Sequence, residues 1–319
     1  MSKISVVGAG AVGTATAYAL LIKEVASEIT LYDIDAAKVE AEVLDLAHGT
    51  QFTGSSRMTG GSDIQVTKNS DLIIVTAGAK QKPGQTRLDL AGVNVAILKS
   101  LLPQLLEHSP NAIFMLVTNP CDVLAVVAQK ITGLPANRIF ASGTVLDSAR
   151  LRWVIAERFK VSSNSVHAHI VGEHGDSEFV LWSQTRIGPV PIADWELEGG
   201  QVITPAELDQ MALDVKNAAY KVIAGKGATN YAIGLSATRI AEAILTDSND
   251  VLSISTVLQN YQGVSGVALS VPTIVNRSGA ARTVDVPMTT AEHEKFLASA
   301  AAIEHSLNSL GYGSKRQPN

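Results

Sequence analysis

The sequence is short of several residue types, and each shortage excludes something. Cysteine occurs once in 319 residues, as Cys121, so no internal disulfide can form and a reducing compartment fits. Basic residues form no run and the formal net charge is −5, which argues against nucleic acid or an anionic membrane surface as a partner. We also find no internal repeat and no low-complexity linker, so any domains should pack directly on each other.

Long uncharged segments are also scarce. The segment Ile4–Ile22, between Lys3 and Lys23, has no charged residue and by hydropathy alone could be a signal peptide or a membrane span. The spacing of the glycines inside it argues against both. We therefore predict a cytoplasmic protein without membrane contact.

The first half of the chain alternates short apolar strands with helices. Strands are predicted at 4–7, 28–32, 71–75, 111–117 and near 138–141, and helices at 11–22, 36–48, 91–106 and 120–132. Several strands are nearly continuous apolar runs, as expected of parallel strands buried on both faces. This rhythm predicts an α/β fold with a Rossmann-type, doubly wound parallel sheet over residues 1–143.

After about residue 143 the rhythm changes. We predict helices at 146–159, 204–223, 229–245 and 289–309, and strand-rich segments at 165–171, 178–187, 250–258 and 266–275. This pattern predicts an α+β catalytic domain over residues 144–319. Its last nine residues are glycine-rich and polar, and we expect them to fray.

A glycine motif, Gly8-Ala9-Gly10-Ala11-Val12-Gly13, follows the first predicted strand and opens the first helix. Gly8 would allow a tight turn, Gly10 would let the backbone approach a pyrophosphate, and Gly13 would let the helix pack on the strand. Asp33 ends the second strand, twenty residues after Gly13, where a carboxylate can bind both ribose hydroxyls and repel a 2′-phosphate. The motif therefore predicts binding of NAD rather than NADP.

A second group of residues predicts acid–base chemistry. His174 lies between glycines in Gly172-Glu173-His174-Gly175-Asp176-Ser177, where backbone can come close to a ligand. Asp147 and Arg150 are three residues apart in a predicted helix and so share a face. Together they offer a proton donor, a carboxylate that orients it, and a guanidinium that can hold a carboxylate.

These residues resemble the L-lactate dehydrogenase branch of the lactate/malate dehydrogenase family, over Ile4 to about Leu310. The resemblance also rests on Thr76-Ala77-Gly78, on Gln81-Lys82-Pro83-Gly84-Gln85-Thr86-Arg87 and on Thr118-Asn119-Pro120. It implies reversible, NAD-dependent reduction of pyruvate to L-lactate in fermentative or glycolytic metabolism.

The resemblance implies a role for each candidate residue. His174 would be the acid/base with Asp147 as its partner, and Arg87, on a mobile loop, would polarise the substrate carbonyl. Substrate contacts would come from Arg150, Gln81, Thr229 and Asn119; for Thr229 a helix N-cap is the alternative role. Cofactor contacts would come from Gly8, Gly10, Val12, Gly13, Asp33, Lys38, Thr76, Ala77, Gly78, Ala79, Ser100, Val117, Asn119, Ser142 and Ile233.

One loop residue bears on which acid is reduced. Malate enzymes of the family carry an arginine where this chain has Gln81, to neutralise the second carboxylate of oxaloacetate. Without it oxaloacetate would bury an unpaired carboxylate, which favours pyruvate. Lys82 beside it keeps malate dehydrogenase or a broader 2-hydroxy acid activity open.

The resemblance also implies regulation and assembly. Arg152 and His167 match positions where allosteric bacterial relatives hold fructose 1,6-bisphosphate across a subunit interface, although a plain surface arginine and strand histidine are the alternative. We expect a homotetramer.

Two other classes of protein fit less well. A non-catalytic NAD-binding protein would be free to lose His174, Asp147, Arg87 or Arg150, and all four are present. A glycosidase or dehydratase on the same fold would need metal ligands, but the seven histidines are scattered, so we expect no metal.

Overall fold

The computed structural model of the protein describes residues 2–79, 87–197 and 199–313. The helices are α1 (Ala11–Ile22), α2 (Ala36–His48), α3 (Arg87–His108), α4 (Cys121–Thr132), α5 (Val145–Phe159), α6 (Pro205–Lys226), α7 (Tyr231–Leu245) and α8 (Thr290–Ser309). The longer strands are β1 (Lys3–Val7), β2 (Glu28–Tyr32), β3 (Arg57–Gly61), β4 (Leu72–Val75), β5 (Ile113–Leu116), β6 (Ile139–Ala141), β12 (Asp250–Val257), β13 (Ala268–Asn276) and β14 (Gly279–Thr283). Five two-residue strands lie between α5 and α6: β7 (Val166–His167), β8 (Ile170–Val171), β9 (Phe179–Val180), β10 (Arg186–Ile187) and β11 (Val190–Pro191).

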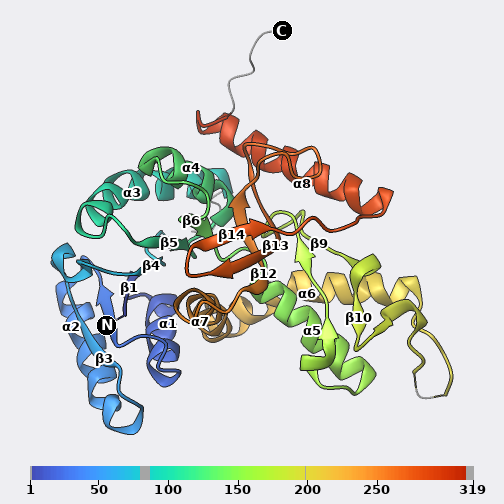
Figure 1. Cartoon of the computed structure of the whole chain (residues 1–319), viewed down its shortest axis with the longest axis horizontal. Coiled ribbons are helices and arrows are strands. Elements are labelled where there is room, and N and C mark those ends of the chain that lie inside the picture. The colour runs from blue at the N-terminus through green and yellow to red at the C-terminus, as the bar shows by residue number, and fades with distance from the viewer. Residues whose placement is uncertain (1, 80–86, 198, 314–319) are drawn as a thin grey trace.

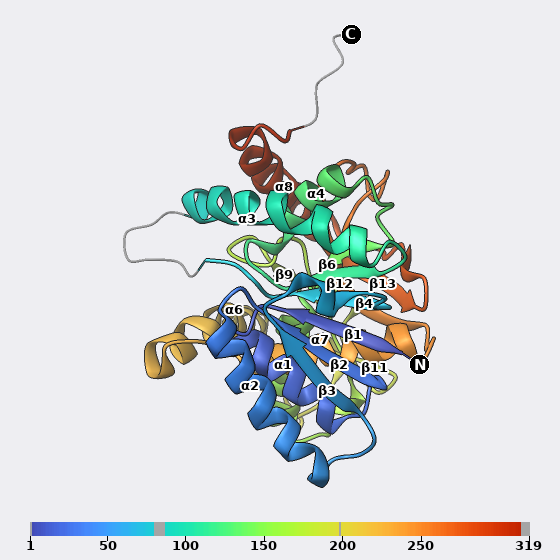
Figure 2. The same ribbon diagram turned by 90° about the vertical axis from the view of Figure 1, so that its left-hand side faces the viewer.

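A parallel sheet forms the first half of the molecule. Its strands run in the order β3–β2–β1–β4–β5–β6, all parallel, which is the order of a doubly wound dinucleotide-binding sheet. Helices α3 and α4 lie on one face and α1, α2 and α7 on the other (Figure 2). The predicted Rossmann-type fold is confirmed.

The sheet does not stop where the first half of the chain ends. Ser255 of β12 pairs with Ala141 of β6, and β13 and β14 follow in antiparallel order, so one sheet of nine strands crosses the molecule (Figure 1). The sequence placed these strands in the second domain alone. The division near residue 143 therefore stays a prediction, because the sheet continues across it.

Besides the two-residue β11, two strands of the nine-stranded sheet were not predicted, β3 and β14, and both are edges of that sheet. An edge strand is covered less completely than a central one and needs fewer apolar side chains. In β3 the only large apolar residue is Met58, and β14 reads Gly-Ala-Ala-Arg-Thr. Neither segment therefore carries the apolar signal that revealed the central strands.

Apolar layers on both faces bury the sheet. One contains Phe114, Leu124 and Phe296, from β5, α4 and α8, and the other contains Leu20 and Ile240, from α1 and α7. A third cluster lies between α5, α6 and the short strands.

The two halves of the chain also pack directly on each other. At Gly234 of α7 an added Cβ would lie 2.8 Å from the backbone of Ala15 in α1, so only glycine allows the two helices to approach this closely. This contact, together with the shared sheet, fixes the second half of the chain against the first.

The uncharged N-terminal segment is part of this core. Ile4–Ile22 forms β1 and α1, and Ile4, Leu20 and Leu21 are buried. Within the described residues one helix, Leu88–His108 of α3, is long and apolar enough to cross a membrane by length and composition alone. It packs on α4.

Candidate active site

The glycine motif forms a tight turn between β1 and α1. Gly8 has φ +107°, a conformation that favours glycine, and an added Cβ at Gly13 would lie 1.8 Å from the carbonyl oxygen of Gly8. At Gly10 an added Cβ would meet nothing within 4 Å. The turn is therefore closed by Gly8 and Gly13 and open to solvent at Gly10.

Asp33 and Thr76 hold this turn from two neighbouring strands. The Asp33 carboxylate accepts a hydrogen bond from the Ala9 amide at 2.6 Å, and the Thr76 hydroxyl donates to the carbonyls of Val7 and Gly8 at 3.0 and 3.1 Å. The carboxyl ends of β1, β2 and β4 thus meet at one place, where a doubly wound sheet binds its ligand.

The next strand ends continue this edge. An added Cβ at Gly78 would lie 2.3 Å from the Thr118 side chain, so the segments after β4 and β5 touch. Asn94 of α3, a buried residue that the sequence did not suggest, accepts from the Ala79 amide at 2.8 Å and donates to the Asn119 carbonyl at 2.7 Å. Its side chain therefore joins two predicted binding segments.

The other predicted cofactor residues are more dispersed. Ala77 follows Thr76, Val117 and Ser142 follow β5 and β6, Val12 and Ile233 lie half-buried in the first turns of α1 and α7, and Lys38 and Ser100 lie exposed on α2 and α3. Their contacts with a cofactor stay predictions.

The residues at this edge fit NAD. The open space at Gly10 is where a pyrophosphate would approach, and the first turn of α1 has no acidic side chain that would repel it. Asp33, at the end of β2, has the position of a ribose ligand.

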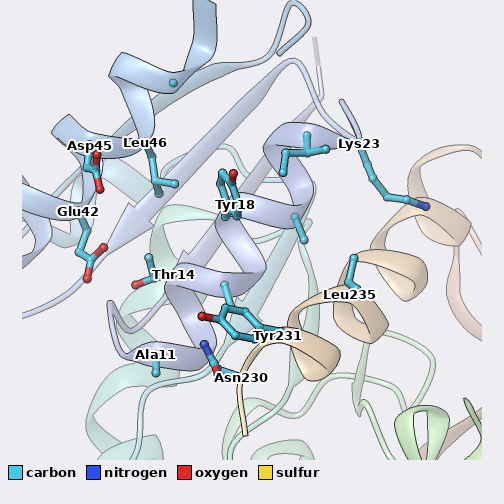
Figure 3. Close-up of a pocket in the computed structure, with 14 residues that line it drawn as sticks. Ala11, Thr14, Tyr18, Lys23, Glu42, Asp45, Leu46, Asn230, Tyr231 and Leu235 are labelled. Atoms are coloured by element: carbon cyan, nitrogen blue, oxygen red, sulfur yellow. The ribbon is translucent and has the colours of Figure 1, made fainter. Parts of the chain in front are cut away.

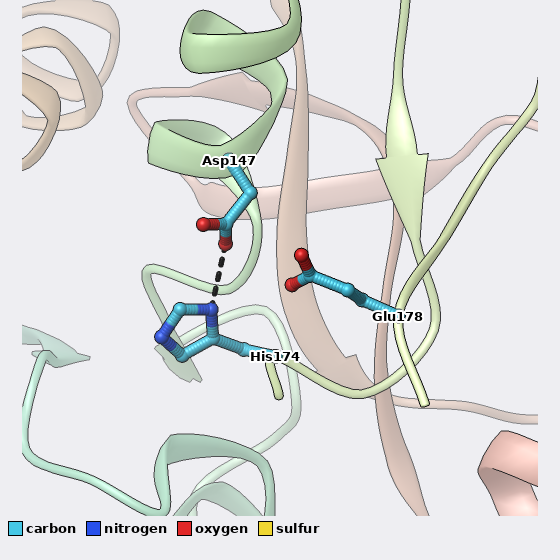
Figure 4. Close-up of side chains that lie close together, drawn as sticks. All are labelled: Asp147, His174 and Glu178. Carbon is cyan, nitrogen blue, oxygen red and sulfur yellow. Dashed lines mark hydrogen bonds and ion pairs between the residues drawn. The ribbon is translucent and has the colours of Figure 1, made fainter. Parts of the chain in front are cut away.

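A buried carboxylate–histidine couple lies on the other side of the strand ends. His174 Nδ1 is 2.7 Å from Asp147 Oδ2, and Arg150 Nη1 is 2.7 Å from Asp147 Oδ1 (Figure 4). An ionised carboxylate only accepts hydrogen bonds, so Nδ1 carries a proton and Nε2 is the nitrogen left to exchange one. The Asp147 side chain is 3% exposed, whereas 28% of His174 is exposed.

The charges of this couple support each other. Burial raises the pKa of Asp147, but the charges and hydrogen bonds of His174 and Arg150 outweigh it and hold that pKa below its usual value. Burial likewise lowers the pKa of His174, but Asp147, with Glu178 and Asp122, outweighs it and raises the pKa to about 9. His174 is therefore protonated at neutral pH and ready to act as an acid.

These residues open into a cavity of about 290 Å³. Among the predicted residues, Asn119, Asp147, Arg150 and His174 line it. Three further wall residues belong to the quoted motifs but were given no role: Pro120, Gly175 and Asp176. Sequence reasoning missed the others, which are Leu90, Glu178, Lys216, Ala219, Tyr220 and Ile223. Much of the missed set belongs to α6, whose sequence has no motif.

Asp122 anchors the loop that carries His174. Its Oδ2 accepts from the His174 amide at 2.9 Å, and its side chain is almost fully buried at the start of α4. Within the described part of the chain its Oδ1 and the buried Ser255 hydroxyl have no hydrogen-bond partner. Burial raises the pKa of Asp122 to about 6, although the charge and the amide of His174 oppose this rise.

Ser299 of α8 is a second anchor. Its hydroxyl accepts from the Glu173 amide at 2.6 Å and lies 2.9 Å from the Ser177 hydroxyl. Ser299 is fully buried. The segment around His174 is therefore held from both sides, by α4 and by α8.

Three predicted substrate residues lie outside this arrangement. Gln81 is outside the described residues, and Arg87 begins α3 with a side chain that is outside them too. Thr229 lies half-buried between α6 and α7. Its alternative role as a helix N-cap is wrong, because the N-cap of α7 is Asn230.

The two predicted effector residues lie together. Arg152 Nε donates to the carbonyl of Ala168, the residue after His167, and His167 is exposed. Arg186 faces His167 across the β7–β10 pair. Burial lowers the pKa of the neighbouring His169 to about 4, helped by Arg152 and His167.

A doubly wound sheet with a glycine turn, beside a buried histidine–carboxylate couple and an arginine, defines the class of dinucleotide-dependent dehydrogenases. Comparison with protein families identifies which one. Residues 2–141 match the NAD binding domain of lactate/malate dehydrogenase, and residues 144–310 match the alpha/beta C-terminal domain of lactate/malate dehydrogenase. The chain belongs to the lactate/malate dehydrogenase family.

Individual relatives agree over nearly the whole chain. An L-lactate dehydrogenase of Bifidobacterium animalis subsp. lactis is 47% identical over 98% of both chains, and one of a Synechococcus species is 45% identical over 97% of this chain and 99% of its own. A crystal structure of a lactate dehydrogenase from a deep-sea metagenome library has a TM-score of 0.93, with 37% identity over 98% of this chain and 99% of its own. The minor L-lactate dehydrogenase of Enterococcus mundtii has a TM-score of 0.92, with 38% identity over 97% and 98%.

Proposed function

We propose that the protein catalyses the reversible, NAD-dependent reduction of pyruvate to L-lactate. The observation that carries this proposal is the His174–Asp147–Arg150 arrangement. It places a protonated imidazole and a guanidinium on the wall of one small cavity. The names of the relatives support the same conclusion.

Each residue has a defined task in this reaction. NADH supplies the hydride that reduces the keto carbon, and His174 Nε2 gives its proton to the oxygen that becomes the hydroxyl. Asp147 fixes the imidazole through Nδ1 and stabilises its charged form. Arg150 bonds the other oxygen of Asp147 through one nitrogen, and its remaining N–H groups, which bond to no other described residue, would hold the substrate carboxylate.

The test follows NADH absorbance with purified protein, comparing pyruvate with oxaloacetate. We expect a strong preference for pyruvate, because Gln81 offers no charge to a second carboxylate. A preference for oxaloacetate would overturn the proposal and make the protein a malate dehydrogenase.

One observation favours that second candidate. Lys216 of α6 lines the same cavity as Arg150, so a second cation is present within the described residues. Its ammonium group already donates to the main-chain carbonyl of Asp176. Lys216→Met would separate the two cases: activity on oxaloacetate should fall sharply only if this lysine binds a second carboxylate.

We also propose that the working unit is a homo-oligomer, expected to be a tetramer. A hollow of about 720 Å³ lies between α1, α2 and α7 (Figure 3), and its lining includes none of His174, Asp147 and Arg150. Tyr18, Tyr231 and Leu235 on its walls are 55%, 72% and 55% exposed, an apolar surface typical of a subunit contact. Sedimentation at micromolar concentration tests this, and a monomer would contradict it.

Fructose 1,6-bisphosphate is the proposed effector. Two contacts support it: His167 pairs with Arg186 across β7 and β10, and Arg152 binds the carbonyl of Ala168, the residue after His167. Phosphate groups need several such cations. Pyruvate saturation curves that superimpose with and without the sugar phosphate would contradict it. A cytoplasmic location also stays a prediction.

A further inference from the structure

A third titratable group faces the catalytic couple. Glu178, just before β9, points its carboxyl toward Asp147 and His174 (Figure 4). Ligand atoms of the three side chains all lie within 4.8 Å of one another. The motif used in the sequence analysis ends at Ser177, so it did not include Glu178.

Glu178 lies on the Nδ1 side of the imidazole, the side held by Asp147 (Figure 4). It lines the cavity, and its carboxyl has no hydrogen-bond partner among the described residues. A half-buried carboxylate without such a partner is poorly stabilised, so the group has reason to keep its proton. Its charge state therefore depends on the charges around it.

Those charges come from three elements. On α5 they are Asp147 and Arg150, on α6 Lys216, and on the loop before β9 His174 and Asp176; Tyr220 of α6 completes the titratable wall of the cavity. Asp147 opposes ionisation of Glu178, whereas His174, Arg150 and Lys216 favour it. Two carboxyl groups thus compete for one imidazolium.

We propose that Glu178 is a third acid group of the Asp147–His174 couple, a positioning residue that controls how firmly His174 holds the proton it gives to the substrate. The role of Glu178 in catalysis rests on the proposed function. The close approach of the three side chains is observed in the structure and does not depend on that function.

As a consequence, Glu178 can stabilise the protonated imidazole of His174 in addition to Asp147, to an extent that depends on pH. Burial, with the charge of Asp147, raises the pKa of Glu178 to about 8, so near pH 7 it is mostly neutral. Above pH 8 it ionises and adds a negative charge beside His174, whose pKa is about 9. Ionised Glu178 thus keeps His174 protonated at alkaline pH, which favours reduction and delays the neutral imidazole that oxidation needs.

The same three residues could hold a divalent cation. Two observations favour a proton instead. His174 Nδ1 is already bonded to Asp147, and Arg150 occupies the other Asp147 oxygen, so the ligand atoms are in use. Lys216 also places a positive charge nearby. Activity and pH profile unchanged by a chelator are the expected result.

The test is the pH profile of Glu178→Gln. The alkaline limb of kcat/KM for pyruvate reduction should move down by about one pH unit, since an opposite charge at this distance shifts a pKa by one unit or more. The rise of lactate oxidation with pH should move down equally. Glu178→Asp should lie between, and Asp194→Asn, an exposed carboxylate elsewhere, should change neither limb. An unmoved limb in Glu178→Gln would overturn the proposal.

A measurement without substrate keeps the two proposals separate. An NMR titration of labelled histidine, with the His174 signal assigned by its loss in His174→Asn, should show two inflections in the wild-type protein and one in Glu178→Gln. Two inflections in a protein inactive on pyruvate would refute only the proposed function. A single inflection in the wild-type protein would refute the role of Glu178, even if its variants fail to fold.

Discussion

The two halves of the active centre are built from different parts of the chain. The cofactor side is mainly backbone: the turn Gly8–Gly13 and the strand ends, tied by hydrogen bonds from Asp33 and Thr76. The catalytic side is mainly buried side chains, with Asp147, His174 and Asp122 brought from three separate elements.

Because of this difference, the two sides of the active centre should be damaged by different kinds of substitution. A backbone site depends on space, so it is damaged by an atom added where none fits. A side-chain site depends on charge and hydrogen bonds, so it is damaged by an atom removed or exchanged. Substitutions that separate binding, stability and turnover therefore test the comparison.

The largest effect is expected at His174. His174→Asn removes the proton donor, and turnover of pyruvate should fall by about 10³-fold, within the range found for general acid–base catalysis. NADH binding, measured by fluorescence, should persist because the cofactor side is untouched. His305→Asn, on an exposed histidine of α8, is the control. Near-normal turnover in His174→Asn would remove this residue from the mechanism.

The cofactor side is tested by a matched pair of glycines. In Gly13→Ala the new Cβ would meet the Gly8 carbonyl oxygen at 1.8 Å, so we expect a loss of about 3 kcal/mol in the free energy of unfolding, together with weaker NADH binding. In Gly10→Ala the new Cβ meets nothing within 4 Å and φ is −75°, so stability should hold.

The second member of the pair is the sharper test of cofactor placement. Gly10→Ala should still weaken NADH binding about tenfold or more, because the methyl group would occupy the space of the pyrophosphate. Denaturant unfolding and NADH titration of both variants give the comparison. Unchanged NADH affinity in Gly10→Ala would show that the cofactor does not approach this turn.

The same contrast explains what the sequence could predict of the fold. Central strands such as β4 and β5 are continuous apolar runs and were found, and so was the turn between β1 and α1, whose residues are contiguous. The edge strands β3 and β14 were missed because they lack that pattern. The pairing of β6 with β12 depends on contacts across more than a hundred residues, which no local pattern contains.

The candidate site divides in the same way. His174, Asp147 and Arg150 stood out by spacing and by family resemblance, whereas Asp122 and Glu178 did not. A carboxylate inside the otherwise apolar start of α4 was the available signal for Asp122, because buried acids are rare without a task. Which acids face the imidazole depends on how α4, α5 and the loop before β9 pack, and this only the structure describes.

A smaller effect is expected on the preference for pyruvate over oxaloacetate. Gln81→Arg should raise activity on oxaloacetate relative to pyruvate by about tenfold or more, because a new charge can pair with the second carboxylate. The ratio of kcat/KM values for the two acids is the measurement, and Gln81→Lys controls for charge without the planar guanidinium. An unchanged ratio in Gln81→Arg would show that this position does not set specificity here.

The smallest effect is expected at Ser299, which touches no reacting group. Ser299→Ala would remove the hydroxyl to which the Glu173 amide donates, and loss of such a hydrogen bond costs about 1 kcal/mol, shared here between local stability and the placement of the loop. We expect kcat to fall several-fold while NADH affinity stays the same, since the Ser299 hydroxyl contacts Glu173 and Ser177 of the His174 loop. Ser309→Ala, an exposed position on the same helix, should change neither. Equal losses of kcat and NADH affinity in Ser299→Ala would mean that the two halves are not separately held, and the contrast between backbone site and side-chain site would fail.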